Sequence, residues 1–257
     1  MATQLHPARP DQAPGGVALG AGMSRQWRGD GVQHQGARPY QEDSWALKPL
    51  ADGALLAVVC DGMGGHAGGA VASRLAIEAF VNVVAGQGRS LRDGLTTANQ
   101  AVGTGATARK ELAGMGTTLV AAIVRNDEVS WISVGDSPFY LIASRQLTRL
   151  NADHSMAPQI EALVARGVLS HDEAEHHPGR HTLREAVMGE PLTLIDQGTR
   201  RLPADARLLL CSDGVQTLAE ADLLAHGGAG PARDLVDAVL AARKPHQDNV
   251  TVVLMER

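Results

Sequence analysis

Short apolar runs that end at Gly, Asp or Asn limit the possible folds of this chain more than any other feature. Runs of about four to eight residues rich in Val, Leu and Ile are typical of β-strands. The six expected strands are Leu55–Cys60, Thr118–Val124, Val129–Val134, Phe139–Ala143, Ala206–Cys211 and Asn249–Met255. They come in neighbouring pairs, and the second and third are joined by Arg125–Glu128, whose Asn-Asp step favours a hairpin. Paired neighbours predict antiparallel sheets.

The stretches between these runs have apolar residues at the spacing of an α-helix. Val71, Leu75, Ala79 and Val83 recur at four-residue steps, which places them on one face of a helix. The expected helices are Ala70–Val84, Leu91–Leu112, Ala157–Arg166, His171–His176, Thr182–Met188 and Ala232–Ala242. A regular alternation of strand and helix is missing, so the order favours an α+β fold with helices packed outside antiparallel sheets.

Composition narrows the classes of partner and compartment. The net charge is −5 without a run of basic residues, which argues against nucleic acid or an anionic membrane as the partner. The longest wholly apolar stretch, Ala54–Cys60, is far shorter than the roughly 20 residues of a spanning helix. Residues 1–23 lack the apolar segment of a secretory signal. We therefore expect a flexible tail over residues 1–23, one domain over residues 24–257 and a cytoplasmic location.

Acidic residues gather at the ends of the expected strands. They are Asp61 and Asp213, each followed by Gly, together with Asp136, Asp248 and the pair Glu42 and Asp43. Each site alone is compatible with ordinary turn chemistry, in which Asp-Gly is common. Several carboxylates brought together at one sheet edge would repel one another unless cations lay between them. Mg²⁺ and Mn²⁺ are the cations that prefer such oxygen ligands.

The motifs around these acids resemble the bacterial form of the metal-dependent protein phosphatases of the PP2C (PPM) family. The matching segments, in family order, are RPYQEDS, VVCDGMGGHAGGAVAS, GMGTTLVAA, VGDSPFYLI, LTRLNADHS, LLLCSDGV and DNVTVV. They extend from Arg38 to Val253, about five-sixths of the chain. The resemblance implies a four-layer αββα sandwich, with two central antiparallel sheets flanked by helices and a metal centre at one end.

The resemblance also implies a role for each acidic position. Asp61 matches the carboxylate that bridges two metal ions, and Gly62 matches the residue that offers its carbonyl to one of them. Asp213 and Asp248 would complete the second metal site. The remaining matches are Asp43 and Glu42 in or just outside the ligand shell, Asp136 at a third and weaker metal, and Arg38 on the substrate phosphate.

The implied reaction is metal-dependent hydrolysis of phosphoserine and phosphothreonine in proteins. Two Mn²⁺ or Mg²⁺ ions would lower the pKa of a bridging water, and the resulting hydroxide would attack phosphorus directly. The resemblance further implies phosphorylated protein substrates, a cognate Ser/Thr kinase that the enzyme opposes, no nucleic acid or membrane partner, and a monomer. Two other readings stay open: a non-catalytic module that recognises a phosphorylated partner, and a hydrolase of small phosphoesters.

Three positions depart from the family pattern. Gln41 stands where bacterial relatives commonly have Asn. Pro138 stands where a GDSR motif would place arginine, which removes a charge and an N–H and puts the local ion pairing in doubt. Met63 occupies the position of a histidine proposed as general acid in eukaryotic relatives, so that role has no counterpart here. No proposed primary metal ligand is lost, and we expect an active enzyme.

The other reactive residue types are expected to be structural. Cys60 and Cys211 follow apolar residues and have no flanking cation, so buried thiols are predicted. His66 and His154 lie inside motif segments and are expected to make structural hydrogen bonds. The tract HDEAEHHPGRH over residues 171–181 has irregular spacing for a zinc site and is interpreted as a solvated helix and loop.

Overall fold

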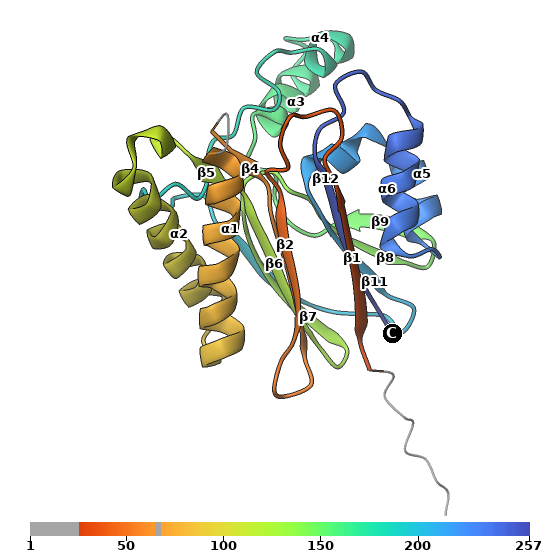
Figure 1. Cartoon of the computed structure of the whole chain (residues 1–257). Coiled ribbons are helices and arrows are strands. Elements are labelled where there is room, and N and C mark those ends of the chain that lie inside the picture. The colour runs from red at the N-terminus through yellow and green to blue at the C-terminus, as the bar shows by residue number, and fades with distance from the viewer. Residues whose placement is uncertain (1–25, 65–67) are drawn as a thin grey trace, which may run out of the picture.

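The computed structural model describes residues 26–64 and 68–257. The expected tail over residues 1–23 and His66 lie outside the described residues. Two five-stranded antiparallel sheets form the centre of the molecule (Figure 1). The order of the first sheet is β10 (Asp196–Arg201), β7 (Glu128–Val134), β6 (Leu119–Arg125), β3 (Leu55–Cys60) and β2 (Ser44–Pro49). The order of the second is β1 (Arg28–His34), β12 (Val250–Glu256), β11 (Arg207–Cys211), β8 (Phe139–Ala143) and β9 (Gln146–Arg149).

Strand β3 shows why the sheets stack as they do, because every one of its side chains is buried. Leu56, Val58 and Cys60 lie in the apolar layer shared with the helices, whereas the alternate side chains of β3 lie between the two sheets. A side-chain period of two on a strand buried on both faces requires a layer on each side. Strand β12 repeats the pattern, with Val253 facing the other sheet and Val252 facing a second pair of helices.

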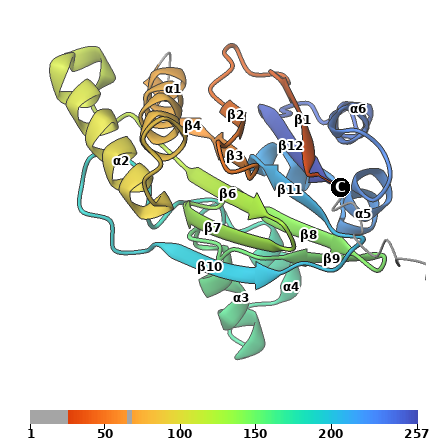
Figure 2. The ribbon, with the colours of Figure 1, turned by 90° about the horizontal axis from the view of Figure 1, so that it is seen from below.

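Two pairs of helices form the outer layers (Figures 1 and 2). On the first sheet lie α1 (Gly68–Val81), extended by the π-helical η1 (Asn82–Gly86), and α2 (Leu91–Ala108), which begins at a Ser90 capping box. On the second lie α5 (Glu220–Gly227) and α6 (Ala232–Ala241). The short helices α3 (Ala157–Ala165) and α4 (His171–Glu175) lie at one end of the sandwich. The predicted four-layer αββα arrangement is confirmed.

One helix, Gly68–Gly86, has the length and mean hydropathy, 1.3, of a membrane-spanning segment by composition alone. Its buried side chains, among them Ala72, Ala76 and Phe80, pack in the apolar layer with α2 and the first sheet. This is the environment of a core helix, which passes the same test of length and composition.

The helix predicted over Thr182–Met188 is wrong. This segment is irregular, and its backbone hydrogen bonds run to other parts of the chain. The Thr182 carbonyl accepts from the Met156 N–H, and Val187 exchanges two bonds with Thr117. The apolar spacing of the segment therefore reflects burial against several elements. The elements whose bounds the sequence did not predict include β1, β2, β9, β10, α5, the 3₁₀ helix η3 (Asp213–Thr217) and the two-stranded pair β4 (Gly62–Met63) and β5 (Gly116–Thr117).

Strand register brings the acidic segments to one end of the sandwich. In the first sheet Ser44 pairs with Cys60 and Leu119 with Val134, so the start of β2 and the ends of β3 and β7 lie at the same edge. In the second sheet Cys211, the end of β11, pairs with Val252 near the start of β12. Antiparallel pairing thus converts acids scattered through the sequence into neighbours.

Candidate metal centre

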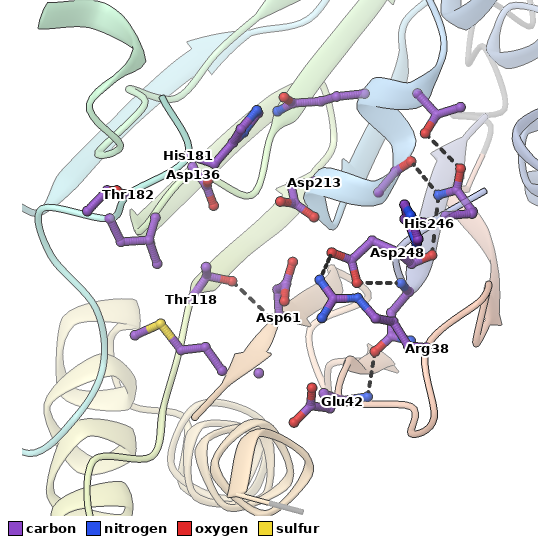
Figure 3. A pocket seen from close by; sticks show the side chains of 18 of the residues that line it. Arg38, Glu42, Asp61, Thr118, Asp136, His181, Thr182, Asp213, His246 and Asp248 are labelled. Carbon is purple, nitrogen blue, oxygen red and sulfur yellow. Dashed lines mark hydrogen bonds and ion pairs between the residues drawn. The ribbon is translucent and has the colours of Figure 1, made fainter. Parts of the chain in front are cut away.

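A cleft of about 880 Å³ opens at this end of the sandwich (Figure 3). Most of the residues predicted for the site line it, namely Arg38, Glu42, Asp61, Gly62, Asp136, Asp213 and Asp248. Asp43, the remaining one, does not line the cleft and is buried. The structure therefore brings the predicted acidic residues into one region, from both sheets and from the loops that lead into them.

Asp43 joins the two sheets beneath the cleft. Its Oδ2 atom accepts hydrogen bonds from the hydroxyls of Ser212 and Thr251, each at 2.7 Å, whereas its Oδ1 atom is buried without a partner. Burial raises the pKa of Asp43 to about 7. An unpartnered buried carboxylate oxygen is costly, and a cation or an ordered water would relieve that cost.

Asp61 follows β3, and its backbone is fixed by the β5–β6 segment. The Asp61 N–H donates to Thr118 Oγ1 at 3.0 Å, and its carbonyl accepts from the Thr118 N–H at 2.8 Å and from Thr117 Oγ1 at 2.9 Å. Burial, followed by the charges of Asp43 and Asp213, raises the pKa of Asp61 well above its ordinary value. These carboxylates therefore repel one another, as expected of a site built to hold cations.

Backbone packing explains why glycine follows Asp61. A Cβ atom at Gly62 would lie 2.2 Å from the Gly69 carbonyl oxygen and 2.5 Å from that of Glu42. A side chain is thus excluded and the loop can pack closely. Glu42 lies beside it with its Oε1 atom buried and unpartnered, and burial raises its pKa.

Arg38 and Asp248 form an ion pair across the mouth of the cleft, with Nη2 and Oδ2 at 2.5 Å (Figure 3). The loop that carries Arg38 is fastened by Asn249, whose Nδ2 donates to the carbonyls of Gln35 and Tyr40 and whose Oδ1 accepts from the Glu42 N–H. Asn249 was not predicted as a site residue, although it belongs to the DNVTVV segment. Its position directly after Asp248 was the available signal.

The turn that carries Asp136 is held by residues 149–154. The carbonyls of the three successive turn residues Gly135, Asp136 and Ser137 accept from the His154 N–H at 3.2 Å, Arg149 Nη2 at 2.7 Å and Asn151 Nδ2 at 2.9 Å. An arginine, Arg149 from β9, therefore contacts this turn although position 138 is a proline. Burial, followed by the charge of Asp213, raises the pKa of Asp136 to about 7.

The donor set fits hard divalent cations, but the side chains are not closed around an ion. Among residues 26–64 and 68–257, no three His, Cys, Asp or Glu side chains are close enough together to hold one metal. The unpartnered oxygens of Glu42 and Asp43 and the mutual repulsion around Asp61 show which groups a cation would satisfy. Asp248 already accepts from Arg38 at Oδ2 and from the Asn249 N–H at Oδ1, so a cation at Asp248 would share the carboxylate with these donors.

The other reactive groups lie as follows. Cys60 and Cys211 are buried and free, and burial raises the pKa of both thiols, so the prediction of inert core thiols is confirmed. His154 is buried, and its Nδ1 atom accepts from the Gly135 N–H at 3.3 Å. His181 and His246 both line the cleft, a position that their spacing in the sequence did not indicate.

Known proteins share the sequence and the fold of this chain. A family model for protein phosphatase 2C matches residues 28–247. The serine/threonine phosphatase stp of Listeria monocytogenes is 32% identical over 234 residues, which cover 86% of this chain and 91% of the relative.

Solved structures agree in fold over nearly the whole chain. The serine/threonine phosphatase PstP/Ppp of Mycobacterium tuberculosis has a TM-score of 0.76 and 30% identity, covering 90% of this chain and 98% of that one. The catalytic domain of a serine/threonine protein phosphatase PstP, solved with two manganese ions, has a TM-score of 0.73 and 27% identity over 90% of this chain and 97% of that one. The chain therefore belongs to the protein phosphatase 2C family.

Proposed function

We propose that this protein is a Mn²⁺- or Mg²⁺-dependent phosphatase that hydrolyses phosphoserine and phosphothreonine in proteins. The observation that carries the proposal is a cluster of carboxylates beside the guanidinium of Arg38: Glu42 and Asp43 each have an unpartnered buried oxygen, and burial and the charges of Asp43 and Asp213 raise the pKa of Asp61. Its relatives are named serine/threonine phosphatases.

Each acidic residue has a place in this proposal. Asp61 lies between the acids of the two sheets and would contact two ions, with the Gly62 carbonyl beside it. Asp213 and Asp248 would complete one of the sites, and Asp43 and Glu42 would act largely through water. Asp136 would hold a third ion. When bound, the cations supply the Lewis acidity that makes water a nucleophile near neutral pH and offsets phosphoryl charge.

The chain's own residues bind and orient the substrate. Arg38 is half exposed at the mouth of the cleft, where its guanidinium can donate two parallel hydrogen bonds to phosphoryl oxygens. Asn249 fixes the loop of Arg38 and so sets the distance between the phosphate and the carboxylates. Both thiols are buried, so a covalent phosphocysteine intermediate has no nucleophile here. A Ser/Thr kinase that supplies the phosphorylated substrates is the proposed counterpart.

The test is hydrolysis of a phosphothreonine peptide with Mn²⁺, before and after chelation and in Asp61→Asn. We expect chelation to abolish turnover and Asp61→Asn to lower it by more than about 100-fold, because even residues that only orient metal ligands cost about 10- to 100-fold. Asp237→Asn, on the exposed face of α6, is the matched control and should retain wild-type turnover. Turnover that survives chelation would overturn the proposal, as would phosphopeptide binding without hydrolysis at saturating Mn²⁺.

A further inference from the structure

A short turn between α6 and β12 forms one wall of the cleft. The Lys244 carbonyl accepts from the Gln247 N–H at 3.2 Å, which closes a four-residue turn with Pro245 at its second position. Proline fixes its own backbone φ near the value that this position needs, so the turn is restricted before any ligand arrives.

Gln247 anchors the turn to the catalytic loops on both sides. Its buried side chain donates to the Gly214 carbonyl at 3.2 Å and accepts from Thr217 Oγ1 at 2.7 Å, which ties it to the segment after Asp213. Its own carbonyl accepts from the Ala37 N–H at 2.8 Å, beside Arg38. The turn therefore holds a fixed position relative to the proposed phosphate site.

Two polar side chains of this turn line the same cleft as the carboxylates. They are Lys244 and His246, and Figure 3 shows His246 next to Asp248, on the side of Arg38. In the described part of the chain, no carboxylate pairs with Lys244. The facing wall is formed by residues such as Met63, Thr182 and Leu183, with the imidazole of His181 beside them.

The size of the cleft leaves room beyond the phosphoryl group. Its 880 Å³ lies in the upper part of the range of about 300–1,000 Å³ that accommodates drug-sized ligands. A phosphorylated residue seated between Arg38 and the carboxylates would therefore bring the neighbouring residues of its peptide against the cleft walls. One wall offers a lysine and an imidazole, and the other offers the imidazole of His181 and no lysine or arginine.

Divalent cations remove the excess negative charge of the site. Five carboxylates line the cleft and Asp43 lies beneath it, against the two fixed cations Arg38 and Lys244, so the metal-free site carries a charge of −4 with its acids ionised. Two divalent ions add four positive charges and bring it to 0. The metal-loaded site therefore no longer repels an anionic peptide, and the ammonium of Lys244 can attract it locally.

We infer that Lys244 and His246 form a subsite for an anionic side chain next to the phosphorylated residue, so that the enzyme selects acidic phosphopeptides. The inference rests on the proposed phosphatase function. The recognised group is a carboxylate or a second phosphate, to which the Lys244 ammonium and the His246 ring present hydrogen-bonding nitrogens. An exposed pair of this kind contributes little binding energy, so it tunes selectivity and leaves the reaction itself to the carboxylates.

The experiment compares kcat/KM for phosphothreonine peptides that carry Glu, phosphoserine, Gln or Lys at one flanking position at a time. We expect the Glu and phosphoserine peptides to exceed the Gln peptide by about two- to fivefold at low ionic strength, with the ratio falling towards one as salt rises. The Lys peptide should be the poorest. The two anionic arms show which group the subsite prefers.

Reversing the charge at Lys244 tests whether the preference for acidic peptides comes from the turn over residues 244–247. In Lys244→Glu the preference should invert towards the Lys peptide, and in His246→Gln it should shrink. The chain has two other lysines, Lys48 and Lys110, and Lys48→Glu makes the same change of net charge on strand β2. That control should keep the wild-type ratio. Equal ratios for Lys244→Glu and Lys48→Glu, or a wild-type ratio of one at every flanking position, would overturn the inference.

Binding separates failure of the subsite from failure of the proposed function. The same peptides, made with a non-hydrolysable phosphonate, are titrated into the Mn²⁺-loaded protein. If no phosphopeptide is hydrolysed, the phosphatase function fails, and the ratio of dissociation constants for the Glu and Gln peptides still decides the subsite. If all peptides are hydrolysed with equal kcat/KM and bound with equal affinity, the subsite fails and the phosphatase function stands.

Discussion

The cleft has a floor and a rim that are built in different ways. The floor consists of Asp61, Asp136 and Asp213, with Asp43 buried beneath them. These residues sit at strand ends and are held by neighbouring strands. The rim consists of Arg38, His181, Lys244 and His246, which stand on the loops between elements. Asp43 is 4% exposed, whereas the Arg38 side chain is 51% exposed.

This difference between floor and rim separates the residues expected to bind metal ions from those expected to contact the substrate. The floor is determined by sheet register and by hydrogen bonds such as those from Ser212 and Thr251 to Asp43, so its geometry is fixed before any ligand binds. The rim depends on local turn chemistry, and loops of this kind change without disturbing the sandwich. We conclude that the floor is built to hold the cations, whereas the rim, which carries Arg38, is built to contact the phosphorylated substrate.

Arg38→Met is expected to show the largest difference between the effect of a substitution on kcat/KM and its effect on Mn²⁺ affinity. The variant removes the donor to the phosphoryl oxygens, and kcat/KM should fall about 100-fold, the usual effect of losing one such donor. It also releases Asp248 from its ion pair, so Mn²⁺ affinity should not fall. Steady-state kinetics check the predicted fall in kcat/KM, and calorimetric titration with Mn²⁺ checks the predicted affinity. Loss of Mn²⁺ affinity in parallel with activity would break the division between floor and rim.

Thr251→Val tests the floor without touching the rim. Asp43 would lose one of its two hydroxyl donors while the strand keeps a β-branched side chain of similar shape. We expect Mn²⁺ affinity to fall by about 10- to 100-fold, as for other residues that orient ligands. Thr199→Val, on the exposed edge strand β10, is the matched control for calorimetric titration. Unchanged affinity in Thr251→Val would show that Asp43 does not contribute to the site.

Arg149→Met sharpens the account of the Asp136 turn. It removes the hydrogen bond to the Asp136 carbonyl and the ion pair with Asp153. The weakest of three Mn²⁺ sites should lose about tenfold in affinity, with the two tighter sites unchanged. Arg149→Lys should recover part of the loss because it keeps the charge but not the forked donor geometry. A uniform loss at all sites would indicate a general effect on the fold.

The smallest effect is a dependence of stability on pH at His154. Burial lowers the pKa of this histidine below the value of 6.5 expected in the unfolded chain. The unfolded state therefore binds the proton more readily, and stability is lost as pH falls below about 6.5. Denaturant unfolding at several pH values should show this slope in the wild type. His154→Asn keeps an acceptor for the Gly135 N–H and should flatten it, and an unchanged slope would contradict the assignment.

Strands buried on both faces were the most predictable elements. The bounds of β3 and β8 agree residue for residue with the runs expected from the sequence, because an apolar strand between two layers leaves a continuous hydrophobic signal. Strand β10, with the sequence DQGTRR, has no such signal. It is an edge strand held by backbone pairing to β7. Backbone pairing does not require a particular side-chain pattern, so the sequence of β10 did not indicate a strand.

The residues of the site also fall into a group that could be predicted from the sequence and a group that could not. Residues at strand ends, such as Asp61 and Asp213, could be predicted because each follows an apolar run. His246 and Asn249 could not be placed, since their positions depend on how separate loops meet. The segment over residues 182–188 was misassigned because its backbone pairs with Thr117 and with residues 154–156 instead of forming hydrogen bonds along a helix.

The most direct test of the central claim is a crystal structure of the protein soaked with Mn²⁺ and measured at the manganese absorption edge. We predict anomalous peaks in the floor of the cleft, in contact with Asp61, Asp213 and Asp248. A third, weaker peak is expected beside Asp136. A cleft without anomalous peaks, in crystals of protein that hydrolyses the phosphopeptide, would contradict the account.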